Sequence, residues 1–126
     1  MIHDSCFSFS IRDLETSRKF YSQILGMQVD TLDMGILEMH PPGINRVWMY
    51  PKRNHEPASF TVLNLLVDSI EKEVDRLLSL GIAFERYPGF KTDVKGIVRS
   101  ENGPAIAWFK DPSGNILALI EAAPRA

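Results

Sequence analysis

Two segments of this chain, about 55 residues apart, follow the same plan, and an internal repeat constrains the fold more than any single motif. Each segment has alternating apolar residues, an aspartate, a helical pattern and a closing glycine: Phe7, Phe9, Ile11, Asp13 and Gly26 in the first, and Leu63, Leu65, Val67, Asp68 and Gly81 in the second. The interval from aspartate to glycine is the same in both. The repeat predicts a molecule made of two copies of one supersecondary unit.

The composition is that of one globular domain. The chain has 126 residues, of which 44% are hydrophobic and 24% charged. The formal net charge is −2 with both signs scattered, so we expect neither nucleic acid nor a membrane surface as a partner. The first residues lack the features of a signal peptide, and no apolar stretch is long enough to cross a bilayer. A single cysteine, Cys6, excludes an internal disulfide and suggests a cytoplasmic protein.

Local patterns predict one domain over residues 1–126, with module 1 at about 1–51, a linker at 52–58 and module 2 at about 59–122. The predicted strands are residues 7–11, 27–32, 35–40, 46–50, 60–67, 82–87, 105–110 and 115–121. Asp13 is a good N-cap for the first helix, and the run from Asp68 to Glu71 has the pattern of a capping box for the second. Gly26 and Gly81 suit the left-handed residue that ends a helix.

Each module therefore reads as strand, helix and three strands, which predicts an α+β fold. A helix covers one face of its sheet, so two modules side by side would form a curved, mixed, eight-stranded sheet with helices outside and an open trough. Alternation along the strands sends one set of side chains into the trough: Cys6, Ser8, Ser10, Val62, Asn64, Leu66, Ile116, Ala118 and Ile120. The fourth strand contributes either Trp48 and Tyr50, our candidates, or Val47 and Met49.

The chain resembles the vicinal oxygen chelate superfamily, which includes glyoxalase I, extradiol dioxygenases, fosfomycin-resistance proteins and bleomycin-resistance proteins. Three blocks that together span nearly the whole chain carry the resemblance: Ile11-Arg12-Asp13-Leu14-Glu15 with Phe20-Tyr21 and Leu25-Gly26, Val67-Asp68-Ser69-Ile70, and Ala107-Trp108-Phe109-Lys110-Asp111-Pro112-Ser113-Gly114-Asn115-Ile116-Leu117. The resemblance implies paired βαβββ modules and a homodimer.

In metal-dependent members of that superfamily, the first and last strands of each module carry four metal ligands. The resemblance places these positions at Cys6, at Trp48 or Met49, at Val62 and at Ala118. Valine and alanine cannot bind a divalent ion, and a lone thiolate does not make a site for a hard cation. We therefore expect no metal and no other cofactor there. An off-pattern divalent metal bound through Glu38 and His40 stays an open alternative.

Other residues have weaker claims to a site. Glu38 and His40 share one face of a strand and could form an acid/base pair, although a solvent-side role is simpler. The loop at 91–104 could close over the trough and bring Arg99 or Glu101 to a polar ligand. Trp108, inside the family block, is interpreted as a packing residue.

The leading hypothesis is a metal-free protein that binds a small, partly apolar organic molecule in the trough, with Ser8, Ser10 and Asn64 orienting it by hydrogen bonds. The alternative is an enzyme of the lyase, isomerase or dioxygenase type with a non-standard site. Its candidate groups are Cys6, Glu38, His40 and Glu101. A third possibility is a dimeric interaction domain whose trough is filled by its own side chains.

Overall fold

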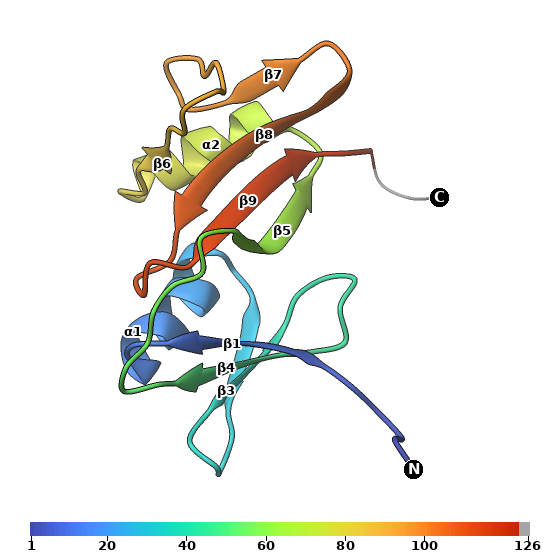
Figure 1. Cartoon of the computed structure of the whole chain (residues 1–126), viewed down its shortest axis with the longest axis vertical. Helices are drawn as coiled ribbons and strands as arrows, with labels where there is room; N and C mark the ends of the chain where they lie inside the picture. The colour runs from blue at the N-terminus through green and yellow to red at the C-terminus, as the bar shows by residue number, and fades with distance from the viewer. Residues whose placement is uncertain (124–126) are drawn as a thin grey trace. The chain divides into compact units, whose positions relative to one another are not determined.

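The computed structural model describes residues 1–123, and the chain divides into two compact units, Met1–Pro57 and Ala58–Ala126, here called module 1 and module 2. The strand–helix–strands order of the repeat is visible in each of them (Figure 1). Each module is described by itself below.

Module 1 is a mixed four-stranded sheet with one helical segment. Its elements are β1 (Phe7–Ile11), α1 (Leu14–Lys19), the π-helical turn η1 (Phe20–Ile24), β2 (Gln28–Thr31), β3 (Leu37–His40) and β4 (Val47–Pro51). The strand order is β1-β4-β3-β2, in which β1 and β4 are parallel and the other pairs antiparallel.

Module 2 repeats this order with one added strand. Its elements are β5 (Thr61–Val67), α2 (Ile70–Ser79), β6 (Phe84–Glu85), β7 (Val98–Ser100), β8 (Gly103–Lys110) and β9 (Ile116–Glu121). The order is β5-β9-β8-β6, and β7, which the sequence did not predict, pairs with β8. The α+β fold of two βαβββ-like mixed sheets is therefore confirmed, while the single eight-stranded sheet stays a prediction.

The two helices begin at different kinds of cap. Asp13 caps α1 as predicted, because its Oδ2 accepts from the N–H of Thr16 at 2.8 Å. The capping box predicted for α2 is wrong, since Ser69 Oγ accepts from the N–H of Lys72 at 3.3 Å. Glu71 does not fold back on the cap, because its carboxylate pairs with basic side chains of the 91–104 segment.

With Asp13 and Ser69 as the caps, the helical segment of module 1 is one residue longer than that of module 2. The extra residue is accommodated in the π-helical turn, where the Leu25 N–H donates to the Phe20 carbonyl at 3.1 Å. Both segments then end at a glycine with positive φ, 71° at Gly26 and 88° at Gly81, as predicted.

The core of each module lies between its helix and one face of its sheet. The largest buried strand residues are Leu37, Met39, Val47 and Met49 in module 1, and Phe109, Leu117 and Leu119 in module 2. The helices contribute Tyr21 to the first core and Ile70, Val74 and Leu77 to the second. The opposite face of each sheet is not covered by a helix and is called the open face.

Candidate functional site

Strand register lines up one row of four side chains across each open face. The row of module 1 is Ser8, Trp48, Glu38 and Asp30, and the row of module 2 is Asn64, Ala118, Trp108 and Glu85. The choice left open for the fourth strand is thereby settled, because Val47 and Met49 are buried on the helix side. Trp48 and Tyr50 therefore lie on the open face.

The open face of module 1 is polar and internally bonded. The indole N–H of Trp48 donates to Glu38 Oε2 at 2.9 Å, and the guanidinium of Arg46 lies 5.9 Å from the centre of the Trp48 ring. Ser10 Oγ and His55 Nδ1 are 2.6 Å apart. Trp48 is thus engaged at its edge and at one ring face by residues of its own module.

Cys6 lies just before β1, outside the row. It borders a surface hollow of about 370 Å³ together with Arg46. Hydrogen bonding to Asp4 first, and then to Cys6, raises the pKa of Arg46. The Arg46 Nη2 is 2.5 Å from Asp4 Oδ2, so its charge is already paired.

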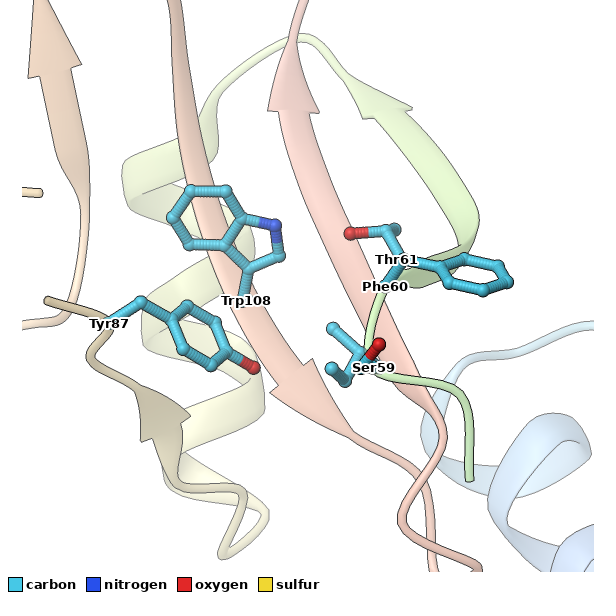
Figure 2. Close-up of a pocket in the computed structure, with 6 residues that line it drawn as sticks. Ser59, Phe60, Thr61, Tyr87 and Trp108 are labelled. Carbon is cyan, nitrogen blue, oxygen red and sulfur yellow. The ribbon is translucent and has the colours of Figure 1, made fainter. Parts of the chain in front are cut away.

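The open face of module 2 has a pocket of about 170 Å³, lined by Ser59, Phe60, Thr61, Tyr87, Trp108 and Ile116. Figure 2 shows the rings of Tyr87 and Trp108 on one side and the Ser59 and Thr61 side chains on the other, with the Phe60 ring pointing away. The Tyr87 and Trp108 rings meet edge to face with centroids 5.5 Å apart. The Phe90 ring packs on Trp108 in the same way at 5.1 Å.

The hydroxyl of Tyr87 is the unusual group in this pocket. It is buried, and no residue of the described range 1–123 forms a hydrogen bond with it. Burial, and to a smaller extent the nearby Glu85 carboxylate, raises the pKa of Tyr87 above its ordinary value. The phenol is therefore protonated at neutral pH. An unpaired buried hydroxyl costs about 1–3 kcal/mol, which a bound group that accepts its hydrogen bond would offset.

Of the predicted trough residues of module 2, Ile116 lines this pocket, whereas Val62, Asn64 and Ala118 lie on the strands beside it. Val62 falls at a β-bulge between Thr61 and Leu63, where the register of β5 against β9 shifts. Asn64 is exposed and pairs with Ala118, which is only 1% exposed.

The 91–104 segment packs against α2, on the helix side of module 2. Lys95 Nζ lies 2.9 Å from Glu71 and 2.8 Å from Asp75, and Arg99 Nη2 lies 2.7 Å from Glu71. Glu101 is exposed in the turn between β7 and β8. The structure therefore does not place this segment, with Arg99 and Glu101, as a lid over the open face.

Three residues of the open faces were not predicted from the sequence as site residues: Trp108, Asp30 and Tyr87. Trp108 packs on aromatic neighbours, as interpreted, and it also lines the pocket. Its place between the buried residues Ala107 and Phe109 is the sequence signal that would have put it on the open face. Asp30 joins Glu38 and His40 only through the register of β2 against β3. Tyr87 follows the short strand β6, and no pattern pointed to it.

Comparison with known proteins agrees with this architecture of two modules, each with one helix-covered face. A family model for the Glyoxalase/Bleomycin resistance protein/Dioxygenase superfamily matches residues 6–119. The chain belongs to this superfamily. In the part of the chain that the structure describes, no helix is long and apolar enough to span a membrane.

Solved structures share the fold at low sequence identity. The fosfomycin resistance protein FosX from Listeria monocytogenes superposes with a TM-score of 0.70 at 12% identity, covering 98% of this chain and 95% of its own. TnmS3, an antibiotic binding protein from Streptomyces sp. CB03234, gives 0.68 at 21% identity, covering 98% and 99%. A superfamily member from Sphaerobacter thermophilus gives 0.70 at 22% identity, covering 97% and 100%.

At the four positions that the superfamily resemblance assigns to metal ligands, this chain has Cys6, Trp48 or Met49, Val62 and Ala118. Val62 and Ala118 have no donor atom, and Trp48 uses its only polar atom to donate to Glu38. Within residues 1–123, the one group of three metal-binding side chains with ligand atoms within 4.8 Å of one another is Asp30, Glu38 and His40, on β2 and β3. This group lies at none of the four assigned positions.

Proposed function

We propose that this protein binds a small, partly apolar organic molecule in the pocket formed by Trp108 and Tyr87 on the open face of module 2. The observation that carries the proposal is the buried hydroxyl of Tyr87, without a hydrogen-bond partner in residues 1–123, beside the indole of Trp108. The lining combines the rings of Trp108 and Tyr87 with the hydroxyls of Ser59 and Thr61, and apolar surface with a few convergent polar groups is typical of small-molecule sites. The fold-level similarity to an antibiotic binding protein is consistent with this class of function.

The size of the pocket limits what it can hold. Its volume of about 170 Å³ is below the roughly 300–1,000 Å³ of sites for drug-sized ligands. A cavity of about 150 Å³ lined by hydrocarbon side chains can hold benzene, so a single ring or a group of that size fits here. A larger ligand would extend toward Ile120 and Ile106, in the next row on the same face.

The pocket also limits the chemistry of the ligand. The Tyr87 phenol stays protonated at neutral pH and can donate a hydrogen bond, so the inserted ring should carry an acceptor such as a ring nitrogen or a carbonyl. Trp108 offers a surface for edge-to-face or offset stacking, and Ser59 and Thr61 offer further hydroxyls. Binding of this kind uses apolar burial and hydrogen bonds and needs no metal ion in the pocket.

Matched pairs of probes test the proposal. Quinoline and naphthalene have the same shape, so one ring of each can enter the pocket while the other extends along the open face, and only quinoline carries a hydrogen-bond acceptor. We expect both to raise the thermal unfolding midpoint by binding the folded state, and quinoline to bind more tightly. Tyr87→Phe should lower the affinity for quinoline by about 3- to 10-fold, the worth of one neutral hydrogen bond, and leave naphthalene unchanged.

Tyr50→Phe is the control, because it makes the same change on the open face of module 1 and should affect neither probe. The proposal fails if neither these probes nor one-ring analogues such as pyridine and benzene shift the midpoint. It also fails if Tyr87→Phe weakens quinoline and naphthalene equally, because the hydroxyl would then have no role in recognition.

Other parts of the initial hypothesis stay predictions. Ser8 and Ser10 lie in module 1, where Ser10 is already bonded to His55, and Asn64 lies in the same row as Trp108. The enzymatic alternative has support from superfamily membership alone, and of its candidate groups only Glu38 and His40 are in contact. The cytoplasmic location is likewise a prediction.

We also propose that the protein forms a homodimer. The supporting observation is a set of large apolar side chains exposed on the strands and at their ends: Phe7 at 73%, Phe60 at 68% and Leu66 at 67%. Large apolar and aromatic side chains are enriched in the cores of homodimer interfaces, where a second copy of the chain would cover them. Size-exclusion chromatography with light scattering should give the mass of two chains at micromolar concentration, and the mass of one chain would overturn the proposal.

A further inference from the structure

We propose that Asp30, Glu38 and His40, on the open face of module 1, form a binding site for a divalent transition-metal ion, for which Zn²⁺ is the model. None of its residues lines the organic-ligand pocket, and none is at a metal position of the superfamily. The ligand atoms lie within 4.8 Å of one another, and the group is partly exposed, so an ion can reach it.

The distances suit metal coordination. His40 Nε2 lies 3.2 Å from Asp30 Oδ2 and 3.2 Å from Glu38 Oε1. Two ligand atoms bound to zinc at about 2.1 Å and at a tetrahedral angle are about 3.4 Å apart. The three atoms can therefore bind one ion after small side-chain adjustments.

The surroundings of His40 orient its Nε2 as the ligand atom. His40 Nδ1 is 3.1 Å from the carbonyl oxygen of Asn45. A carbonyl only accepts, so Nδ1 carries the hydrogen and donates it. A histidine held by a backbone carbonyl in this way, with its other nitrogen directed at a cation, is the usual arrangement in metal sites.

Nε2 then faces two carboxylate oxygens, an arrangement that a cation bound between the three atoms would complete. In residues 1–123 no lysine or arginine forms an ion pair with Asp30 or Glu38, whereas Glu71, Glu73 and Glu85 each have at least one such partner. A divalent ion would bind all three atoms and match the charge of the two carboxylates.

Neighbouring side chains hold the carboxylates in position. Trp48 donates its indole N–H to the second oxygen of Glu38 at 2.9 Å, and Gln28 donates to Asp30 Oδ2 at 3.3 Å. One nitrogen and two carboxylate oxygens favour zinc, cobalt or manganese over calcium, which takes six to eight oxygen ligands. Three protein ligands also leave positions for water or another small molecule.

Calorimetry with Zn²⁺ on the untagged protein, stripped of metal with a chelator and then dialysed, tests the site. We expect one ion per chain with a Kd of about 10 µM or below. His40→Gln and Asp30→Asn should each weaken binding by at least about 10-fold. The matched controls His3→Gln and Asp33→Asn remove a histidine and an aspartate outside the group and should change the Kd by less than about twofold.

A spectroscopic readout locates the ion independently of the calorimetry. In a Trp108→Phe background, Trp48 is the remaining tryptophan, and Co²⁺ bound at Glu38 should quench its fluorescence to saturation at one equivalent. Ca²⁺ at the same concentration should not displace Co²⁺.

The proposal is overturned if the wild type shows no saturable Zn²⁺ binding below about 1 mM, or if His40→Gln and wild type bind equally. Because the Asp30 side chain is half exposed, Asp30→Asn should fold, and it tests the site even if His40→Gln does not fold.

Discussion

In the row across its open face, module 1 has Trp48 on the last strand and Glu38 on the neighbouring strand, where module 2 has Ala118 and Trp108. The indole N–H of Trp48 donates a hydrogen bond to the neighbouring Glu38 carboxylate, so the polar groups of this row are paired with each other. The small Ala118 gives Trp108 no such partner, and Trp108 instead meets the aromatic rings of Tyr87 and Phe90.

The contrast shows how one backbone plan supports two kinds of surface. Apart from the added strand β7, strand order and helix cover are the same in both modules, so the core faces are alike. The open faces differ in a few side chains: Trp48 lies beside Glu38 in module 1, whereas Trp108 lies beside Ala118 and lines a pocket in module 2. Function in this fold therefore lies in a few open-face side chains.

The largest expected effects test whether the core faces are equivalent. Phe109→Ala in module 2 and Met39→Ala in module 1 remove fully buried side chains, so we expect each to lower the free energy of unfolding by about 3–5 and 2–5 kcal/mol respectively. Asn64→Ala, on the exposed open face, should change it by less than about 0.5 kcal/mol. Urea denaturation measures all three. A small effect at Met39 or Phe109 would contradict the shared core plan.

The next effect separates stability from binding in module 2. Tyr87→Phe removes a buried hydroxyl that has no partner in the described residues, so it should raise the free energy of unfolding by about 1 kcal/mol while weakening acceptor-bearing ligands. Tyr50→Phe, which changes an exposed side chain on the open face of module 1, should leave the free energy of unfolding unchanged. Thermal unfolding without ligand gives both values. A destabilised Tyr87→Phe would show that the hydroxyl is satisfied in the free protein.

The smallest effects distinguish the two helix caps by pH. Ser69→Ala should cost about 1 kcal/mol at every pH, because a hydroxyl cap carries no charge. Hydrogen bonding to the Thr16 hydroxyl, and then to its N–H, lowers the pKa of Asp13. Its stabilisation is therefore present above the unfolded value near pH 4, and is lost as the pH falls through the lower folded pKa.

Thermal unfolding of Asp13→Ala at several pH values checks this sign. The variant should melt below the wild type at pH 7, and the gap should close on acidification, whereas the gap for Ser69→Ala should stay constant. An Asp13→Ala gap that is independent of pH would mean that the carboxylate charge contributes nothing to the cap.

Much of the fold followed from periodicity, because burial imposes it. Alternation at Leu63 and Leu65 identified the core face of β5, and the glycines at 26 and 81 marked the helix ends. The capping box failed because Glu71 has stronger partners in Lys95 and Arg99, residues distant in sequence. Local sequence patterns cannot show that residues distant in sequence compete with the helix cap for the Glu71 carboxylate.

The site was harder to predict for the same reason. Glu38 and His40 are neighbours on one strand and were visible in sequence, but Asp30 joins them only when β2 pairs in register. Trp108 lay within a family block and was interpreted as packing, and Tyr87 reaches the pocket from beyond a two-residue strand. Strand register and loop paths place these groups, and both depend on the whole fold.

The central claim is that the organic ligand contacts the tryptophan of module 2. Titrating quinoline into two single-tryptophan variants while following fluorescence tests it most directly. With Trp48→Phe, which leaves Trp108, the account predicts saturable quenching; with Trp108→Phe, which leaves Trp48, it predicts only the weak linear quenching of free collision. Saturable quenching of Trp48, or none at Trp108, would contradict it.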